Sequence, residues 1–278
     1  MPGKKFHLHL VSDATGETLT SVARACLVQF ETIDATSHPW WLIRTEKQVA
    51  RVIAGIEANP GIVLATVLDG GVRGLLEEAC RHMHVPFVQV LDPVMGALSG
   101  YLDAEFGSQP GRQHALDAEY FRRIDAMHFT LAHDDGQMLH DIDDADIIVV
   151  GISRTSKTPT CMYLANRGIK AANIPLVPGI EPPPELFAAK RPLIVGLTKE
   201  PKSLTDIRRS RLQLLNHDKE SDYADPDKVR EEVTMARRLF TLKNWPVIDV
   251  SRRSIEEASA AILQLYIRHT GGDPTGVV

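Results

Sequence analysis

Short apolar segments alternate with segments of helical periodicity along nearly the whole chain. Several of the short segments, such as residues 61–68, are almost continuously apolar, which is typical of strands buried on both faces of a sheet. The expected strands are 6–11, 40–43, 61–68, 85–91, 146–150, 174–177, 192–197 and 246–250. The first expected helix follows residue 17, and the others are 46–57, 72–84, 115–127, 159–166, 204–215, 227–242 and 255–269. Alternating strands and helices form parallel sheets covered by helices, so the sequence predicts an α/β fold.

The regular alternation weakens between residues 103 and 144, where glycines and a proline precede an acidic segment, 133–136. A chain of 278 residues is long enough for two modest domains. We therefore predict an N-terminal parallel-sheet α/β domain over 1–105, a connecting segment over 106–144 and a second, P-loop kinase-like α/β domain over 145–278. Residues 271–278 are glycine-rich and are expected to fray.

The composition excludes several classes of protein. Hydrophobic residues make up 44% and charged residues 24%, as in globular proteins that bury a core. The net charge of -5 disfavours a surface built to bind nucleic acid. No apolar run approaches the roughly 18 residues of a membrane helix, and the first residues lack the apolar core of a secretory signal. We expect a cytoplasmic protein that binds neither nucleic acid nor membrane.

Cysteines and histidines give little support for a metal centre. Cys26, Cys80 and Cys161 are too few and too scattered for a disulfide framework or a metal knuckle, so we interpret them as buried free thiols. His7 and His9 have strand spacing that places both rings on one face, but no carboxylate or cysteine accompanies them.

Residues 146–159 have the order strand, glycine, four residues, small residue, lysine, threonine, helix, which is typical of a phosphate-binding loop. Gly151 permits a tight turn, the following backbone N–H groups can point at phosphate oxygens, and the helix start adds a positive dipole end. Lys157 supplies a cation for the terminal phosphates, and Thr158 supplies a hydroxyl for Mg²⁺. The predicted nucleotide site comprises Gly151, Ile152, Ser153, Arg154, Thr155, Ser156, Lys157 and Thr158.

One residue of this loop departs from the usual pattern. Ser156 stands where a glycine usually precedes the lysine, and it adds a Cβ where the backbone must approach phosphate. Pro159 is compatible with the pattern, because proline is tolerated in the first turn of a helix. The alternative is an ordinary strand-to-helix turn, but the strand-like residues before the loop and the helical residues after it favour phosphate binding.

Basic residues in and after the loop have two interpretations. Arg154 can clamp a phosphate, or it can form a surface ion pair. A basic cluster after the 192–197 strand can close over polyphosphate or contact a partner, or it can simply face water. This cluster comprises Lys199, Lys202, Arg208, Arg209 and Arg211.

With these motifs in place, the sequence resembles the regulatory proteins of pyruvate, phosphate dikinase and of phosphoenolpyruvate synthase. The resemblance covers most of the chain in one order and includes the opening segment, the loop, the acidic segment and the ending. The matching segments are 11–18, 134–136, 151–159, 196–201, 207–208, 247–251 and 254–257. The opening segment is more similar to the dikinase regulators than to the synthase regulators.

The resemblance implies a bifunctional phosphotransferase. Members of that family inactivate the dikinase or synthase by phosphorylating a threonine with ADP as donor. They reactivate it with inorganic phosphate, which removes the phosphoryl group as pyrophosphate. We thus expect ADP as nucleotide substrate, inorganic phosphate as co-substrate of the reverse activity, Mg²⁺ beside Thr158, and the dikinase or synthase as partner. A small-metabolite kinase and a non-catalytic nucleotide sensor are the alternatives, and a homo-oligomer is left open.

Two aspartates compete for the remaining catalytic role beside Lys157 and Thr158. Asp249 lies in the 246–250 strand, where it can face Mg²⁺ or accept the proton of the substrate threonine hydroxyl. Asp13 follows the first strand, at the end where open α/β sheets place ligands.

Overall fold

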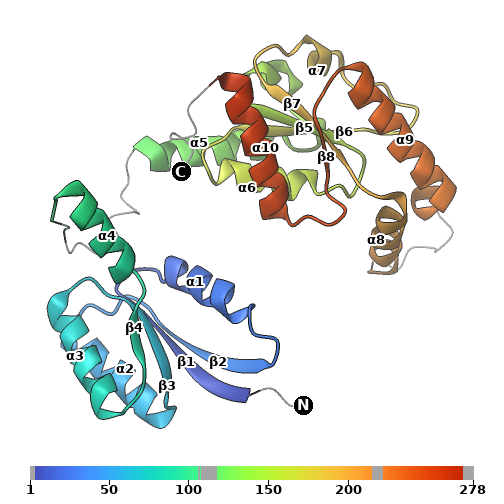
Figure 1. Cartoon of the computed structure of the whole chain (residues 1–278). Coiled ribbons are helices and arrows are strands. Elements are labelled where there is room, and N and C mark those ends of the chain that lie inside the picture. Colours follow the sequence, from blue (N-terminus) through green and yellow to red (C-terminus); the bar gives the residue numbers. More distant parts are fainter. Residues whose placement is uncertain (1–3, 106, 108–117, 215–221, 272–278) are drawn as a thin grey trace. The chain divides into compact units, whose positions relative to one another are not determined.

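The protein is described by a computed structural model that covers residues 4–105, 107, 118–214 and 222–271. The chain divides into two compact units, Met1–Ala115 and Leu116–Val278. Each unit contains a four-stranded parallel sheet with helices packed against it (Figure 1). The expected α/β fold is therefore confirmed.

The first unit has the strand order β2-β1-β3-β4, and all its strands are parallel. Its elements are β1 (Lys4–Ser12), α1 (Glu17–Leu27), β2 (Ile33–Trp40), α2 (Glu46–Ala58), β3 (Gly61–Thr66), α3 (Gly70–His82), β4 (Phe87–Gln89) and α4 (Asp92–Leu102). Val11 and Val63 pack with α2 and α3 on one face of the sheet. Leu8 and Leu10 pack with α1 on the other face. Alternate strand residues thus supply two separate cores.

The strand expected at 40–43 is wrong, because β2 occupies Ile33–Trp40 instead. β2 lies at an edge of the sheet, and its residues alternate between exposed and half-buried positions. Edge strands tolerate polar residues and proline, and β2 contains Pro39. The sequence prediction relied on a run of apolar residues, which an edge strand such as β2 does not need. Helix α4 was not expected at all.

Three histidines of the first unit gather on one side of the sheet. The His7 Nδ1 and His38 Nε2 atoms are 2.9 Å apart, and the His38 ring stacks on the ring of His9. His9 is fully buried; its Nδ1 accepts a hydrogen bond from the Trp40 indole at 3.2 Å, and its Nε2 donates to the Asn59 carbonyl at 2.9 Å. Burial lowers the pKa of His9, and the nearby His38 and His7 act in the same direction.

The second unit has the strand order β6-β5-β7-β8, again entirely parallel. Its helices and strands are α5 (Ala118–Ala132), β5 (Ile147–Gly151), α6 (Lys157–Ala165), β6 (Ala171–Pro175), α7 (Pro184–Ala188), β7 (Leu193–Thr198), α8 (Pro201–Leu214), α9 (Pro226–Leu242), β8 (Val247–Asp249) and α10 (Ile255–Thr270). Three short 3-10 helices are η2 (Asp134–Gly136), η3 (Leu139–Asp144) and η4 (Asp222–Ala224).

Strand β5 is the centre of this unit, and all of its residues are buried. Ile147 and Val149 pack against α6 and α10 on one face of the sheet. Ile148 and Val150 pack against α8 and α9 on the other face. A strand buried in this way gives the loop that follows it a rigid starting point.

The acidic segment and the helix before it also belong to the second unit. The Thr130 hydroxyl of α5 accepts a hydrogen bond from the Ala171 backbone N–H at 3.1 Å, and the His133 carbonyl accepts one from Asn173 at 3.2 Å. The unit therefore begins before residue 145, where the sequence placed its start. Most of 106–117 lies outside the described residues, as does the tail expected to fray, apart from Gly271.

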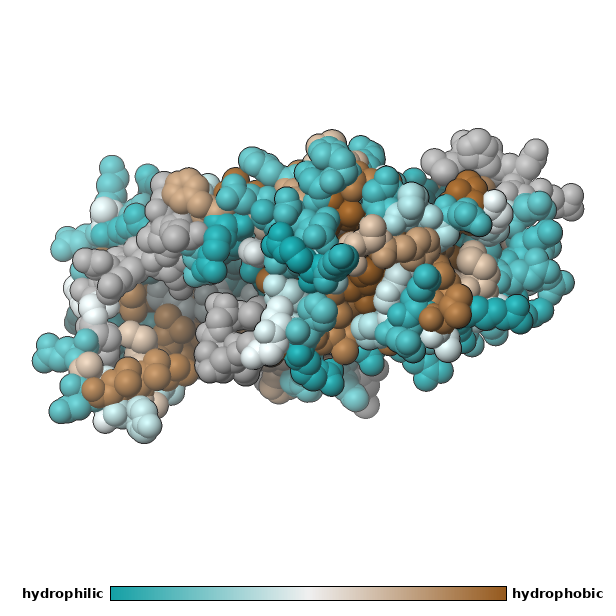
Figure 2. All heavy atoms as spheres, turned by 90° about the horizontal axis from the view of Figure 1, so that it is seen from above, coloured by the Kyte–Doolittle hydropathy of each residue, from teal (hydrophilic) through white to brown (hydrophobic). Residues whose placement is uncertain are grey.

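The face of the chain seen in Figure 2 is mostly hydrophilic, with hydrophobic residues in separate patches. Exposed apolar side chains include Val94, Leu98 and Tyr101 of α4. None of the described helices has the length and apolar character needed to cross a bilayer. Cys80 and Cys161 are buried free thiols, as expected, whereas Cys26 is a free thiol on an exposed position.

Candidate phosphate-binding site

The loop after β5 leaves the sheet at a point that favours ligand binding. The chain passes from β5 to β6 on one side, and then crosses to β7 on the other side. Gly151, the last residue of β5, pairs with Pro175 of β6 and with Leu197 of β7. In open α/β sheets, ligands bind beyond the carboxyl ends of the strands at such a switch in strand order.

Gly151 is required by close packing at the start of the loop. A Cβ at this position would lie 2.8 Å from the Thr155 Oγ1 atom and 2.9 Å from the Leu197 carbonyl oxygen. Thr155 is fully buried, and its hydroxyl donates a 2.9 Å hydrogen bond back to the Ile152 carbonyl. The first half of the loop is therefore compact, and a larger residue at position 151 would push it away from the sheet.

Two loop residues other than glycine have left-handed backbone conformations, Arg154 with φ 70° and Ser156 with φ 63°. Such residues between right-handed neighbours turn successive N–H groups towards one concave side. Ser156 thus takes the conformation for which glycine is usually needed before the lysine, at a cost of about 1 kcal/mol. Ser156 is also the N-cap of α6, and within the described chain its side chain makes no cap hydrogen bond.

Lys157 is buried inside the loop, with only 7% of its surface exposed. Its ammonium group donates a hydrogen bond to the Ile152 carbonyl at 3.3 Å. Burial lowers the pKa of Lys157, and the negative charges of Asp135 and Asp134 partly offset that effect. The loop therefore holds a desolvated cation at the start of α6, which suits an incoming anion.

An acidic group from a distant part of the sequence lies beside Thr158. The Thr158 hydroxyl donates a 2.9 Å hydrogen bond to the Asp134 Oδ1 atom, and the Asn173 side-chain amide donates to the same oxygen. The Oδ1 atom of the Asn173 side chain accepts a hydrogen bond from the backbone N–H of Asp135 at 3.2 Å, which fixes η2 against β6. Sequence reasoning used Asp134 only as part of a resemblance and did not place it in the site.

The Thr158 hydroxyl and the Asp134 carboxylate fit a Mg²⁺ ion. Magnesium prefers oxygen ligands and is commonly held by one or two carboxylates together with substrate phosphates. No group of three or more histidine, cysteine or carboxylate side chains that could hold a metal occurs among the described residues.

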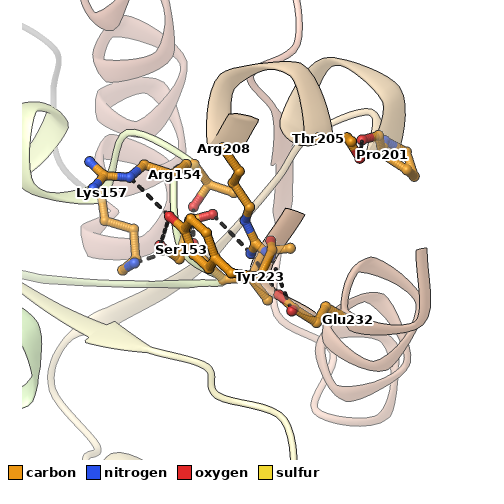
Figure 3. Close-up of polar contacts among 10 residues, drawn as sticks. Ser153, Arg154, Lys157, Pro201, Thr205, Arg208, Tyr223 and Glu232 are labelled. Carbon is orange, nitrogen blue, oxygen red and sulfur yellow. Dashed lines mark hydrogen bonds and ion pairs between the residues drawn. The ribbon is translucent and has the colours of Figure 1, made fainter. Parts of the chain in front are cut away.

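Residues of α8, η4 and α9 support the outer part of the loop (Figure 3). The Tyr223 hydroxyl lies 3.1 Å from the Ser153 hydroxyl and accepts from the Arg154 Nε atom at 3.2 Å. Arg208 donates to the Ser153 carbonyl at 3.3 Å and forms a 2.6 Å ion pair with Glu232. Neither interpretation of Arg154 given above describes this contact with a tyrosine.

The basic residues expected to form one cluster after β7 differ in their burial. Arg208 is 1% exposed, and its guanidinium lies in the interior of the unit rather than on a surface. The sequence predicted that Arg208 would face either a ligand or water, and it does neither, because its side of α8 packs against the rest of the unit. Arg209 and Arg211 of the same helix are exposed.

Asp249 is the last residue of β8, so it lies at the same carboxyl-terminal edge of the sheet. Its carboxylate accepts hydrogen bonds from the Ser251 backbone N–H, at 2.9 Å, and from the Ser251 hydroxyl, and it lies 3.6 Å from Arg237. Burial acts to raise the pKa of Asp249, but the bonds from Ser251 and the charge of Arg237 outweigh it, so the pKa is lowered. One strand, β7, separates β8 from β5 in the sheet. Its catalytic role stays a prediction.

Asp13 lies in the first unit, at the corresponding switch in strand order after β1. It is 3% exposed, and its Oδ2 atom accepts a 2.7 Å hydrogen bond from the Leu68 backbone N–H. Burial raises the pKa of Asp13. Its catalytic role also stays a prediction.

A strand, a compact loop with a buried lysine and a helix start at a switch in strand order are typical of α/β proteins that bind nucleotide phosphates. The profile of a family described as kinase/pyrophosphorylase matches residues 8–263. The chain belongs to this kinase/pyrophosphorylase family, and the resemblance found in the sequence is thereby confirmed.

Relatives of this chain carry one shared name. A protein of Paramagnetospirillum magneticum is 68% identical over 96% of this chain and 86% of its own length. One of Rhodospirillum rubrum is 57% identical over 95% of this chain and 96% of its own length. One of Caulobacter vibrioides is 53% identical over 94% of this chain and 82% of its own length. All three are provisionally named pyruvate, phosphate dikinase regulatory protein.

Proposed function

We propose that this protein is a bifunctional regulator that phosphorylates a threonine of pyruvate, phosphate dikinase with ADP and later removes that phosphoryl group with inorganic phosphate. The observation that carries the proposal is the buried Lys157 ammonium in the loop after β5, next to the oxygen pair of Thr158 and Asp134. The kinase/pyrophosphorylase family and the names of the relatives support it. Those names favour the dikinase over phosphoenolpyruvate synthase as the target. We place the regulator and the dikinase in the cytoplasm.

In the forward reaction the threonine hydroxyl oxygen attacks the β-phosphorus of ADP. The bond between that phosphorus and the bridging oxygen breaks, AMP leaves, and the hydroxyl proton is released to a base. Phosphoryl transfer depends mainly on positioning and on neutralising charge, and the loop amides and Lys157 can supply both. A bound Mg²⁺ would neutralise further phosphate charge.

In the reverse reaction an oxygen of inorganic phosphate attacks the phosphothreonine phosphorus. The threonine oxygen leaves and takes the proton of the hydrogen phosphate, and the product is pyrophosphate. Both reactions move a phosphoryl group that carries negative charge, so a site that gathers backbone N–H groups around a cation suits both. Asp249 and Asp13 are the candidates for the base of the forward reaction.

The test is to incubate the protein with purified dikinase, Mg²⁺ and ADP labelled in its β-phosphate. We expect the label on a dikinase threonine, with release of AMP, and then in pyrophosphate after inorganic phosphate is added. The Lys157→Ala variant should stay folded and transfer nothing, since it lacks the loop cation. The proposal is contradicted if the label remains in ADP or moves to a metabolite. It is also contradicted if the dikinase is phosphorylated only when labelled ATP replaces ADP.

A further inference from the structure

The outer part of the phosphate loop has two polar side chains that contact one tyrosine. The Ser153 hydroxyl and the Arg154 Nε atom lie 3.1 Å and 3.2 Å from the Tyr223 hydroxyl oxygen. Figure 3 shows the side chains of Ser153, Arg154 and Tyr223 close together, joined by these contacts. Burial acts to raise the pKa of Tyr223, but the bonds from Ser153 and Arg154 outweigh it, so the pKa is lowered. The phenol oxygen thus lies where an anionic oxygen would be favoured.

Arg208 holds this tyrosine in place from the other side. The Arg208 guanidinium lies 4.6 Å from the centre of the Tyr223 ring and donates a 2.9 Å hydrogen bond to the Tyr223 carbonyl. Arg208 is itself 1% exposed and is paired with Glu232. Moving Tyr223 away would leave a buried guanidinium with fewer partners, which is unfavourable. The tyrosine is therefore a fixed part of the loop's surroundings.

The inner and outer parts of the loop offer different groups to phosphates. Phosphate-binding loops seat the inner phosphates on their backbone N–H groups, while the lysine reaches the terminal ones. Here the amides at the start of α6 and Thr158 would hold the inner phosphates, and Lys157 would reach the terminal phosphate of a diphosphate. A further phosphate would extend towards Ser153 and Arg154, whose side chains Tyr223 already occupies.

We propose that Tyr223 sets the length of the phosphate chain that the site accepts, so that a nucleoside diphosphate binds with Tyr223 in place and a triphosphate must displace its hydroxyl from Ser153 and Arg154. This inference rests on the proposed function, in which the loop binds the nucleotide. It makes Tyr223 a specificity-determining residue that acts through the loop. A triphosphate loses affinity because Arg208 resists the movement of the tyrosine.

The experiment is to measure dissociation constants for ADP and for a β,γ-imido analogue of ATP, with Mg²⁺, on the full chain. Tyr223→Phe keeps the ring over Arg208 and removes only the hydroxyl. We expect analogue binding to tighten by about tenfold, the effect of one charge-assisted hydrogen bond, while ADP binding stays nearly the same. In the double variant Tyr223→Phe with Arg154→Gln, the gain for the analogue should disappear.

Tyr163→Phe is the matched control. Tyr163, in α6, also accepts a hydrogen bond from an arginine, Arg167, at 2.9 Å, with that guanidinium 4.9 Å from its ring, but neither residue belongs to the loop. This variant should leave the ratio of the two constants unchanged. If wild type binds ADP but Tyr223→Phe leaves that ratio unchanged, the proposal for Tyr223 is wrong and the proposed function stands. If wild type binds neither nucleotide, both are wrong.

Discussion

The ion pair between Arg208 and Glu232 should be among the most sensitive positions of the second unit. Arg208 is 1% and Glu232 13% exposed, and their closest atoms are 2.6 Å apart. The second guanidinium nitrogen also donates to Glu232, at 3.1 Å, so the contact is bidentate. The Glu232→Gln substitution keeps the size of the side chain and removes the charge that balances the buried guanidinium.

The expected loss of stability follows from the burial of the ion pair. Removing one partner of a buried ion pair costs about 3 to 5 kcal/mol, because the other charge is left unpaired. For a unit of this size, each kcal/mol lowers the melting temperature by roughly 2 to 4 °C. We therefore expect Glu232→Gln to lower the melting temperature of the second unit by about 10 °C. ADP affinity should fall as well, since Arg208 also supports Ser153 and Tyr223.

Differential scanning calorimetry of the full chain measures this effect, and helix α9 supplies a matched control. Arg230 and Asp227 form an ion pair of the same length, 2.6 Å, but their side chains are 66% and 81% exposed. Exposed pairs contribute little, so Asp227→Asn should leave the transition almost unchanged. Equal effects of Glu232→Gln and Asp227→Asn would refute the reasoning from burial.

A double variant separates charge from packing. Replacing both partners, Arg208→Met with Glu232→Leu, removes both charges and fills similar space. Such replacements are often neutral or stabilising, so this variant should melt well above Glu232→Gln. If it melts as low as the single variant, the loss comes from packing rather than from an unpaired charge.

Three further predictions concern the site and the first unit. Asp134→Asn keeps an acceptor for Thr158 but removes a charge, so half-maximal activity should need about 10-fold more Mg²⁺; an unchanged requirement in a magnesium titration would exclude Asp134 from the metal site. Gly151→Ala places a Cβ 2.9 Å from the Leu197 carbonyl and should weaken ADP binding in calorimetry, whereas wild-type affinity would show that the loop tolerates the displacement. The lowered pKa of His9 means that the unfolded chain binds its proton first as the pH falls, so the first unit should lose stability below about pH 6.5, by up to roughly 1.4 kcal/mol per pH unit. His9→Gln should remove that part of the pH dependence in urea unfolding, and an identical dependence in both proteins would contradict it.

Buried central elements could be predicted from the sequence because their signals are local. β5 is apolar at nearly every position, and Gly151, Lys157 and Thr158 follow it at fixed spacing, so strand, loop and helix were expected within one or two residues of their bounds. β2 was misplaced because an edge strand needs no apolar run, as its exposed Ser37 illustrates.

Helix α4 was missed for a related reason. None of its residues is buried, so it has no apolar stripe facing a core to reveal its period. The Asp92–Pro93 pair at its start is a helix-initiation signal that could have indicated it.

The rest of the site could not be predicted because it is assembled from distant segments. Asp134 lies 24 positions before Thr158, and Tyr223 lies 70 positions after Ser153. Single-sequence patterns carry no information on such pairs unless a motif is known. Arg208 looked like an ordinary basic residue of an exposed helix, and only the packing of α8 against η4 and α9 shows that it is buried.

The central claim is that the loop from Gly151 to Thr158 holds the phosphates of the nucleotide. A crystal structure of the protein with ADP and Mg²⁺ is the most direct measurement. We expect the β-phosphate oxygens within hydrogen-bond distance of the backbone N–H groups of residues 155–158, with the Lys157 ammonium released from the Ile152 carbonyl to contact them. A diphosphate bound elsewhere, with Lys157 still donating to Ile152, would contradict the account.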